Sequence, residues 1–432
     1  MGFGRSLNQS LRKLFSFLPR QTRFAIYRSF VECDANPDRR LVLKIAETQE
    51  ELEACFKLLH DAYVGSGFMK PDPSGMRITI YHALPTTTTL CAKFDGEVVG
   101  TLSLIRESLL GFPLQTIFDL SRVRERKGQI AEVSALAVHP KFRKTGGTIL
   151  FPLMKFMYNY CTTFFDTRHL VIAVNPNRIE MYESLLFFRR LAEKSVDRYD
   201  FANGAPAVGA TLDLKYAPAQ FAKVYGGKPM RRNMYHYFIE AVMPNIVLPT
   251  RRYFTTNDPV MTPALLDYFF NQRTQVFGQL NEHKKQLLHA IYNLDAFKAV
   301  LPPIDQHIAQ QVHRSHQRYS VKCPGTFELQ VADKGLVYDL LVVNLSLYGF
   351  QVHSQGALPL GEWGEVTIEL GKSEKSFNKA MAVHDRVNGL PGFYGFQLAE
   401  PDLAWRKFVN AMQSGTTHDD LDNATRFLPD AA

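Results

Sequence analysis

Two groups of polar residues in the last third of the chain have the types and spacing of a ligand site. Arg314 and Arg318 lie four residues apart, and Asn344, Ser346 and Gly349 follow at the end of a predicted strand. A planar guanidinium group can stack on a base, or bind a phosphate or a guanine edge through two parallel hydrogen bonds. Asn and Ser add polar groups, and glycine lets a ligand approach the backbone closely. These residues could therefore hold the base and phosphate of a nucleotide.

The same two groups resemble the signature of PilZ domains, which bind the bacterial second messenger cyclic di-GMP. The resemblance implies that Arg314 and Arg318 clamp a guanine and a phosphate, and that Asn344, Ser346 and Gly349 line the other side of the ligand. A solvated linker would account for the two arginines but not for the second group. We therefore expect cyclic di-GMP to be a regulatory ligand.

A second candidate site centres on Glu132, within the predicted strand that ends at Val138. In a regular strand Glu132 and Ser134 share a face with Leu136 and Val138. Small apolar neighbours disfavour the charged form of a carboxyl group, which moves its pKa toward the range of a general base. The plainer alternative is an ion pair between Glu132 and a nearby arginine. Ser134 has no accompanying Ser-His-Asp pattern, so we assign it no catalytic role.

The strand is followed by a basic, glycine-containing turn made of Arg143, Lys144, Gly146 and Gly147, which opens a predicted helix. Free N–H groups at a helix start, together with two cations, suit a phosphate. Farther along, Tyr182 lies on a helix that begins beside the end of a strand, and a phenol can donate a proton to a leaving thiolate. The plainer alternatives are a solvated loop for the turn and a core aromatic side chain for Tyr182.

This layout resembles acyltransferases of the N-acetyltransferase fold, in which a splayed strand pair admits the pantetheine arm of an acyl donor. Over roughly residues 40–290 a closer resemblance is to the N-acyl amino acid synthases, relatives of the acyl-homoserine-lactone synthases. Several blocks agree with their pattern and occur in the same order. The blocks are residues 96–101, 111–114, 131–138, 174–176 with Met181 and Tyr182, and 204–208.

The resemblance implies that a long-chain acyl group moves from acyl carrier protein, or from coenzyme A, to the amine of an amino acid. Glu132 would remove a proton from the attacking amine, directly or through a water, and Tyr182 would protonate the leaving thiol. The turn residues would contact the phosphopantetheine phosphate or an acidic surface of the carrier protein.

Two alternatives to this reaction stay open. Thr148 and Asn177 depart from the family patterns, so the chain could be a cyclic di-GMP-responsive binding protein whose acyltransferase domain has lost catalysis. A lactone-forming synthase that uses S-adenosylmethionine is a third candidate, although nothing in the sequence requires that cofactor.

Hydrophobic periodicity predicts the elements that position these residues. The expected order is strand, helix, two strands joined by the Asp95-Gly96 hairpin turn, strand, helix, strand and helix. It favours an α/β (α+β) N-acetyltransferase-like mixed sandwich rather than a doubly wound sheet. Residues 215–300 form a predicted helical extension, and short alternating strands from Tyr319 onward predict a small all-β PilZ-like barrel.

These elements divide the chain into five predicted segments. They are a basic amphipathic segment at 1–40, the acyltransferase domain at 41–300, a linker at 301–313, the cyclic di-GMP-binding barrel at 314–413 and a flexible tail at 414–432.

Charge and composition restrict the setting of the protein. The formal net charge is +8, and residues 1–30 contain six Arg and Lys residues and no acid. Ser6–Leu18 is a predicted amphipathic helix that can lie on an anionic membrane or dock on its own domain, and we favour docking. The five cysteines form no CxxC pair, so we expect no metal and a reducing compartment. With no apolar run of spanning length, we expect a cytoplasmic protein, with peripheral contact at the inner membrane as an alternative and no nucleic acid polymer as partner.

Overall fold

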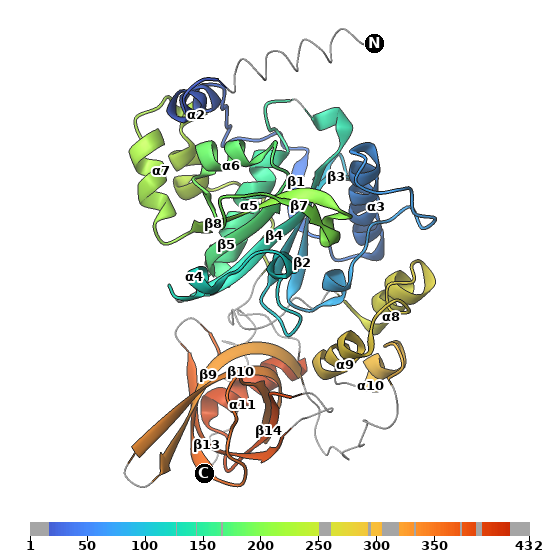
Figure 1. Cartoon of the computed structure of the whole chain (residues 1–432), viewed down its shortest axis with the longest axis vertical. Helices are drawn as coiled ribbons and strands as arrows, with labels where there is room; N and C mark the ends of the chain where they lie inside the picture. Colours follow the sequence, from blue (N-terminus) through green and yellow to red (C-terminus); the bar gives the residue numbers. More distant parts are fainter. Residues whose placement is uncertain are drawn as a thin grey trace.

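The chain folds into a mixed α/β domain followed by a β-barrel (Figure 1). The computed structural model describes residues 17–126, 128–143, 145–165, 167–249, 261–292, 295–304, 319–331, 334–371, 374–385 and 391–414. Lys144, Arg314 and Arg318 lie outside the described residues, as does most of the predicted helix Ser6–Leu18.

The first domain is built on an eight-stranded sheet with the order β1-β2-β3-β4-β5-β8-β6, and β7 pairs with β8. All neighbouring strands are antiparallel except β4 and β5, which are parallel. The strands are β1 (Leu41–Ile45), β2 (Thr87–Phe94), β3 (Glu97–Arg106), β4 (Gln129–Val138), β5 (Thr167–Val174), β6 (Arg189–Arg190), β7 (Val196–Tyr199) and β8 (Ala205–Asp213).

The structure confirms the predicted strands β1 to β5, including the hairpin at Asp95-Gly96. Both turn residues have positive φ, 51° at Asp95 and 84° at Gly96, as a tight two-residue hairpin requires. Strands β6 to β8 were not predicted. The strand β8 pairs with β5, so it extends the sheet beyond the strand that the sequence pattern placed last.

The strand β4 contains a bulge next to the predicted catalytic carboxylate. Ser134 pairs with Ser103, and Ala137 pairs with Thr101, so β4 has one residue more than β3 across this interval. Ala135 takes up the distortion with φ 53°, in a region that side chains other than glycine rarely occupy. The prediction that Leu136 and Val138 share a face with Glu132 and Ser134 is therefore wrong, because the extra residue shifts the alternation by one.

The parallel strands β4 and β5 separate after Glu132, just before the bulge. Their pairing runs from Gln129↔Thr167 to Glu132↔Val171 and then ends, although both strands continue. The second halves of the two strands are thus splayed, which opens the sheet directly after Glu132.

Helices cover both faces of the sheet. One face packs against α5 (Leu150–Phe164), α6 (Ile179–Leu186) and α7 (Ala217–Tyr225), and the other packs against α3 (Gln49–Gly65). The short helices are α4 (Ser121–Arg124), η1 (Ile80–Ala83), η2 (Pro113–Thr116), η3 (Pro140–Phe142), η4 (Asp200–Ala202), η5 (Met230–Arg232) and the π-helix η6 (His236–Glu240).

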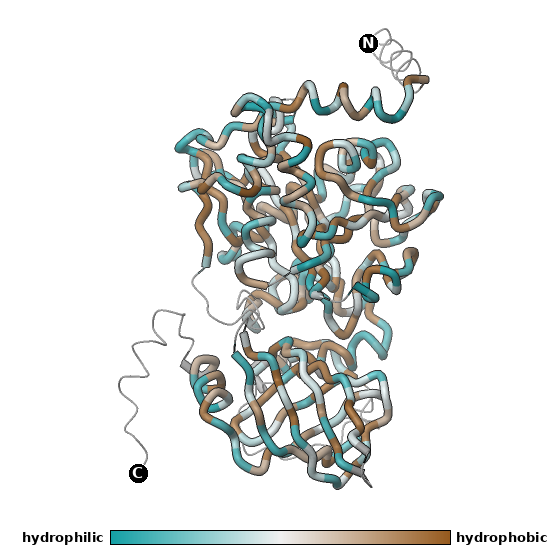
Figure 2. Tube along the Cα trace, turned by 90° about the vertical axis from the view of Figure 1, so that its left-hand side faces the viewer, coloured by the Kyte–Doolittle hydropathy of each residue, from teal (hydrophilic) through white to brown (hydrophobic). Residues whose placement is uncertain are grey.

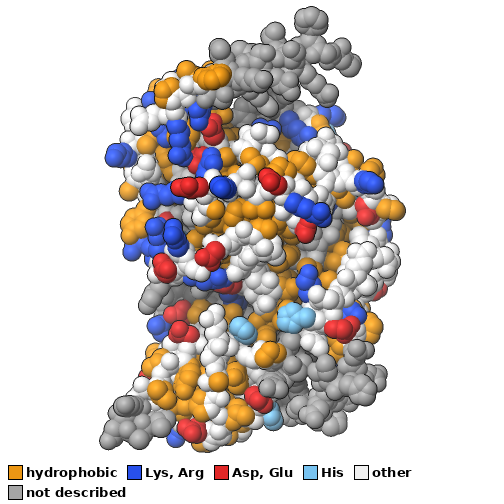
Figure 3. Space-filling model, viewed as in Figure 1, with side chains coloured by type: hydrophobic (Ala, Val, Ile, Leu, Met, Phe, Trp, Pro, Cys, Tyr) orange, Lys and Arg blue, Asp and Glu red, His pale blue; other side chains and the backbone are white. Residues whose placement is uncertain are grey.

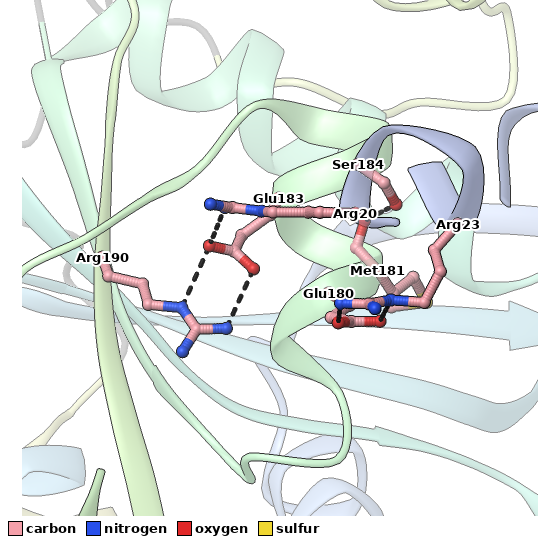
Figure 4. A network of polar contacts seen from close by, with 7 residues as sticks. All are labelled: Arg20, Arg23, Glu180, Met181, Glu183, Ser184 and Arg190. Atoms are coloured by element: carbon pink, nitrogen blue, oxygen red, sulfur yellow. Dashed lines mark hydrogen bonds and ion pairs between the residues drawn. The ribbon is translucent and has the colours of Figure 1, made fainter. Parts of the chain in front are cut away.

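The helix α2 (Arg20–Ser29) docks on α6 through charged side chains (Figure 4). Arg23 binds Glu180 at 2.6 Å, and Arg28 donates to the backbone oxygen of Ser184 at 2.9 Å. Glu183 is paired with both Arg20 at 2.7 Å and Arg190 at 3.0 Å. For this described part of the basic N-terminal segment, the structure shows docking on the domain. Figure 3 shows Lys and Arg side chains gathered at this end of the molecule.

The predicted helical extension is only partly regular. Where two long helices were predicted over residues 261–292, the structure has α8 (Pro263–Asp267), the π-helix η7 (Tyr268–Gln272) and α9 (Glu282–Ile291), followed by α10 (Asp295–Lys298). These elements pack their aromatic residues against α3, with Phe269 in edge contact with Phe56 at 5.2 Å. The apolar spacing therefore reflects burial, while the chain turns between short helices.

The second domain is a closed antiparallel barrel with the order β10-β11-β14-β13-β12-β9. Its strands are β9 (Tyr319–Val331), β10 (Lys334–Ser346), β11 (Gly349–His353), β12 (Trp363–Glu369), β13 (Lys375–His384) and β14 (Phe393–Leu398). Alternating side chains fill its interior, and the hydropathy changes along the strands in Figure 2. The helix α11 (Leu403–Ser414) adds Trp405, whose Nε1 donates to the oxygens of Ser346 and Leu347.

The two domains contact each other near the end of β3 and the beginning of β4. Leu287, Val343 and Phe393 form a small buried cluster with Leu109 and Leu110, which lie in the loop after β3. In addition, Lys322 on β9 is buried and donates from Nζ to Oε1 of Gln129, the first residue of β4, at 3.2 Å. The barrel thus touches both the strand that carries Glu132 and the loop that precedes it.

Candidate active site

A cavity of about 200 Å³ lies where β4 and β5 separate. Its wall includes residues of both splayed strand ends, from Glu132 to Leu136 and from Ile172 to Asn175. It also includes Tyr182 of α6. Since roughly 150 Å³ of apolar space is enough to hold a benzene molecule, this cavity can accept a small organic group. The sheet therefore brings the two predicted catalytic residues to one cavity.

The side chain of Glu132 is a buried carboxyl group with one hydrogen bond among the described contacts. The residue is 1% exposed, and its Oε2 accepts a hydrogen bond from the N–H of Leu114 at 3.0 Å. Burial raises the pKa of Glu132 to about 8, and the hydrogen bond from Leu114 opposes that rise. The predicted effect of the apolar surroundings is confirmed, and no arginine pairs with Glu132 among the described ion pairs. The catalytic role stays a prediction.

The side chain of Tyr182 lies in the wall of the same cavity and is largely buried. Burial raises the pKa of its phenol to about 12, while the positive charge of Arg178 acts in the opposite direction. The phenol therefore carries its proton at neutral pH and can act as a donor. Its ring packs edge-on against Phe188 at 5.8 Å, which holds the side chain in place.

The basic turn after β4 lies outside the cavity wall. The Nε of Arg143 donates to the backbone oxygen of Val138 at 2.8 Å, and the side chain is exposed. Gly146 and Gly147 have φ values of 71° and 90°, and a Cβ on Gly147 would collide with Phe151 of α5. The glycines are thus required by the turn itself, and the contact of Arg143, Lys144, Gly146 and Gly147 with an acyl donor remains a prediction.

A second, apolar cavity of about 30 Å³ adjoins the first. The two share Met154, Met157 and Phe188 in their walls, and the second extends between α5, α7 and β8 toward Phe221 and Phe238. Methionine side chains are unbranched and adapt their shape readily. The partition between the cavities therefore consists partly of side chains that can move.

Several residues of the first cavity were not predicted. Tyr63 comes from α3, Tyr199 and Phe201 come from the segment before β8, and Arg178 precedes α6. No local pattern marks them, because each lies on a different element and none has an unusual neighbour in the sequence. Among the described residues there is no cluster of side chains suited to a metal ion.

In the barrel, three residues of the predicted nucleotide site have structural partners. Asn344 is buried and donates from Nδ2 to Oε1 of Gln351 at 2.6 Å, and the hydroxyl of Ser346 donates to the oxygen of Gly349 at 3.0 Å. A Cβ on Gly349 would lie 2.6 Å from the backbone oxygen of Phe396. These contacts hold the β10–β11 turn, and ligand binding by the three residues remains a prediction.

Comparison with known proteins bears on the first domain. Residues 54–213 match the model of the family described as N-acyl amino acid synthase FeeM. The matched segment contains Glu132, Tyr182 and both splayed strands. The chain is an acyltransferase. Of the alternatives left open by the sequence, this result favours catalysis over a domain that only binds. No curated protein matches the chain.

Several solved structures are similar to this acyltransferase. FeeM, an N-acyl amino acid synthase from uncultured soil microbes, is 24% identical over 42% of this chain and 94% of its own, with a TM-score of 0.35. The CoA-dependent acyl-homoserine lactone synthase BjaI, solved with SAM and isopentyl-CoA, is 17% identical over 44% of this chain and 92% of its own, with a TM-score of 0.33. The acyl-homoserine lactone synthase LasI is 16% identical over 44% of this chain and 97% of its own, with a TM-score of 0.34. The splayed strands and the family match together give the first domain an N-acetyltransferase-like fold.

No helix in the described part of the chain is both long enough and apolar enough to cross a membrane.

Proposed function

We propose that the acyltransferase moves a long-chain acyl group from acyl carrier protein, or from CoA, to the amine of an amino acid. The observation that carries the proposal is the buried Glu132 carboxyl, with its pKa raised to about 8, in one cavity with the protonated phenol of Tyr182. A base and an acid on opposite sides of a reacting carbonyl are what aminolysis of a thioester needs.

The reaction forms one C–N bond and breaks one C–S bond. The neutral amine attacks the thioester carbonyl while Glu132 accepts a proton from the nitrogen, and the tetrahedral intermediate then collapses to the amide. The leaving thiolate takes a proton from Tyr182, which is restored from the proton held by Glu132 through solvent. Backbone N–H groups of β4 near the bulge, where β5 no longer pairs with it, would stabilise the oxyanion. Positioning of amine and thioester supplies the rest of the acceleration.

The acyl chain would extend from the first cavity into the second. The shared wall of Met154, Met157 and Phe188 is apolar, and movement of the two methionines would join the two spaces. Both cavities lie against α5, whose preceding turn carries Arg143, Gly146 and Gly147. A thioester in the first cavity would therefore direct its pantetheine arm toward that turn, where Arg143 and Lys144 would contact a phosphate or an acidic carrier protein.

Product analysis tests this proposal. The full chain is incubated with long-chain acyl carrier protein or acyl-CoA and a mixture of amino acids, and acylated products are identified by mass. We expect N-acyl amino acids from the wild type, and a loss of roughly 100- to 10,000-fold in Glu132→Gln. Glu51→Gln is the matched control, because Glu51 is also a buried carboxylate but pairs with Lys44 and Lys93 away from the cavity. Full activity in Glu132→Gln would contradict the proposal.

We further propose that cyclic di-GMP binds the barrel and regulates the acyltransferase. Support comes from the position of the predicted ligand residues: Asn344 directly follows Val343, which packs with Leu109 and Leu110 at the domain contact. The same loop continues to Leu114, whose N–H binds Glu132. A ligand that shifts the β10–β11 region would thus change the packing of Val343 on Leu109 and Leu110. These leucines lie a few residues before Leu114, which binds the Glu132 carboxyl.

Calorimetry with purified cyclic di-GMP tests the ligand, using the wild type and a double variant with Arg314→Ala and Arg318→Ala. We expect binding to the wild type only. The titration is repeated with the acyl donor present, because coupling between two sites must change both affinities equally. No heat with the wild type would contradict the ligand, and equal affinities with and without donor would contradict the coupling.

A further inference from the structure

A buried arginine behind one wall of the active-site cavity has no part in the reaction steps above. Arg77 lies between α3 and η1 and is 4% exposed. Its guanidinium lies between two rings, 4.0 Å from the centroid of Tyr63 and 5.3 Å from that of Phe201. Both rings face the cavity that contains Glu132. Only the side chains of the cavity wall, including these two rings, therefore separate the guanidinium from the cavity.

The hydrogen-bonding groups of Arg77 are incompletely used within the described part of the structure. Nη2 donates to the backbone oxygen of Phe201, but Nε and Nη1 are buried without a hydrogen-bond partner there. No carboxylate forms an ion pair with Arg77 among the described residues. A buried charge with unsatisfied donors is costly unless a counter-charge meets it at some stage. The arrangement points to an anionic ligand.

A third unsatisfied donor lies close by. The hydroxyl of Tyr199 is buried and has no hydrogen-bond partner among the described residues. The ring of Tyr199 packs on Phe201 with 5.7 Å between centroids, and Tyr199 lines the cavity. The charges of Glu132 and of Arg77 both act on its phenol, so the hydroxyl lies near both groups.

We infer that Arg77 and Tyr199 bind the carboxylate of the acceptor amino acid and so direct its amine toward Glu132. The inference rests on the proposed function. An α-amino acid carries its amine and its carboxylate on one carbon. The protein groups that bind the amine and the carboxylate must therefore lie on either side of one small space. Nη2 has a second N–H besides the one that binds Phe201. Together with Nε or with Nη1 it forms a planar donor edge that matches the two oxygens of a carboxylate. A shift of the Tyr63 ring opens the guanidinium to the cavity.

With this pair of residues the enzyme would select α-amino acids over amines that lack a carboxylate. An amine without a carboxylate would leave Arg77 and Tyr199 unsatisfied beside the bound substrate, and sites built to bind a polar group reject analogues that lack it. The positive charge of Arg77 behind the wall would therefore determine which amines are acylated, while the apolar surface of the cavity would bind the acyl group.

The experiment compares each amino acid with its decarboxylated amine, for example tyrosine with tyramine, using the full chain and one acyl donor. We expect the wild type to favour the amino acid by about 100-fold or more in kcat/KM. Arg77→Gln should lose most of this preference through a higher KM for the amino acid, with little change for the amine. Tyr199→Phe removes only the hydroxyl and should lower the preference by about tenfold or more, as the loss of one hydrogen bond to a charged group implies.

Tyr237→Phe is the matched control, because Tyr237 is another buried tyrosine whose hydroxyl has no partner among the described residues, but it does not line the cavity. It should retain the full preference. Equal use of amine and amino acid by the wild type would overturn the inference and leave acyl transfer standing. Absence of product with every acceptor would contradict the proposed function, and the inference would fall with it. If Arg77→Gln does not fold, an unchanged preference in Tyr199→Phe is sufficient to reject the joint site.

Discussion

The carboxyl group of Glu132 must be ionised to accept a proton, and its surroundings oppose ionisation. With a pKa raised by burial to about 8, the fraction of active base is small at pH 6 and grows through pH 8. We expect kcat/KM, calculated for the neutral amine form of the acceptor, to rise about tenfold per pH unit below that pKa and to level off above it. Initial rates from pH 6 to 9.5, with the donor concentration fixed and the acceptor concentration varied, check this. A profile that is flat between pH 6.5 and 8.5 would contradict Glu132 as the base.

The same group should make the fold less stable at higher pH. The folded-state pKa is raised from 4.5 to about 8, so the folded protein binds more protons than the unfolded chain between these values. The free energy of unfolding therefore falls as pH rises through this window. Glu132→Gln lacks this titration. We therefore expect the Tm of the variant minus that of the wild type to be larger at pH 8.5 than at pH 5. The difference follows from about 1.4 kcal/mol per unit of pKa shift. Thermal unfolding at both pH values is the measurement, and an equal Tm difference would argue against a raised pKa.

The helix pair α2 and α6 illustrates how the first domain positions Tyr182, the proposed proton donor. The outer face of α6 carries Glu180 and Glu183, which bind arginines of α2 and β6, while Tyr182 between them faces the cavity. Removing the negative charge of Glu183, whose side chain is 3% exposed, leaves two arginines without their partner. The docking of α2 is therefore expected to hold α6 at the splayed edge of the sheet.

Glu183→Gln tests that expectation. Because both arginine partners are partly exposed, the loss should be smaller than for a fully buried pair, about 1–3 kcal/mol in the free energy of unfolding. Glu400→Gln is the control, since Glu400 forms an exposed pair with Arg406 and should change little. Denaturant unfolding measures both variants. If the two behave alike, the α2–α6 contact contributes nothing to stability.

The contact between the two domains has a small apolar part close to the candidate active site. Leu109 and Leu110 pack against Val343 of the barrel, and their loop leads to the N–H that binds Glu132. The acyltransferase is therefore expected to respond to changes in the barrel through this loop.

Replacing one leucine of this contact separates binding from regulation. In Leu110→Ser we expect cyclic di-GMP to bind with unchanged affinity, while the ratio of kcat/KM with and without nucleotide moves toward one. Hydrogen exchange of the backbone amides between residues 107 and 114 should be faster in the variant, because its apolar cover is weakened. Leu360→Ser is the control, as Leu360 is exposed on the barrel. An unchanged nucleotide effect in Leu110→Ser would exclude the loop as the connection.

Local patterns were sufficient for much of the architecture. Alternating apolar residues predicted β1 to β5 and the barrel strands, and the turn at Asp95-Gly96 predicted the β2–β3 hairpin, because strand periodicity and turn conformation depend on neighbouring residues. The environment of Glu132 was predicted for the same reason: its adjacent residues are small and apolar, and they remain beside it in the folded chain.

Other features depend on how distant segments meet. The bulge at Ala135 reverses the faces of Leu136 and Val138, and its cause is the pairing with β3 rather than any local signal. Arg77, Tyr63 and Tyr199 come together from segments far apart in the sequence, because the sheet places β8 beside β5 and α3 across its face. Side-chain convergence of this kind follows from strand order and register, which periodicity does not specify. The sequence thus pointed to Glu132 and Tyr182, the proposed proton-transfer residues. The cavity they share and the guanidinium behind its wall exist only in the tertiary structure.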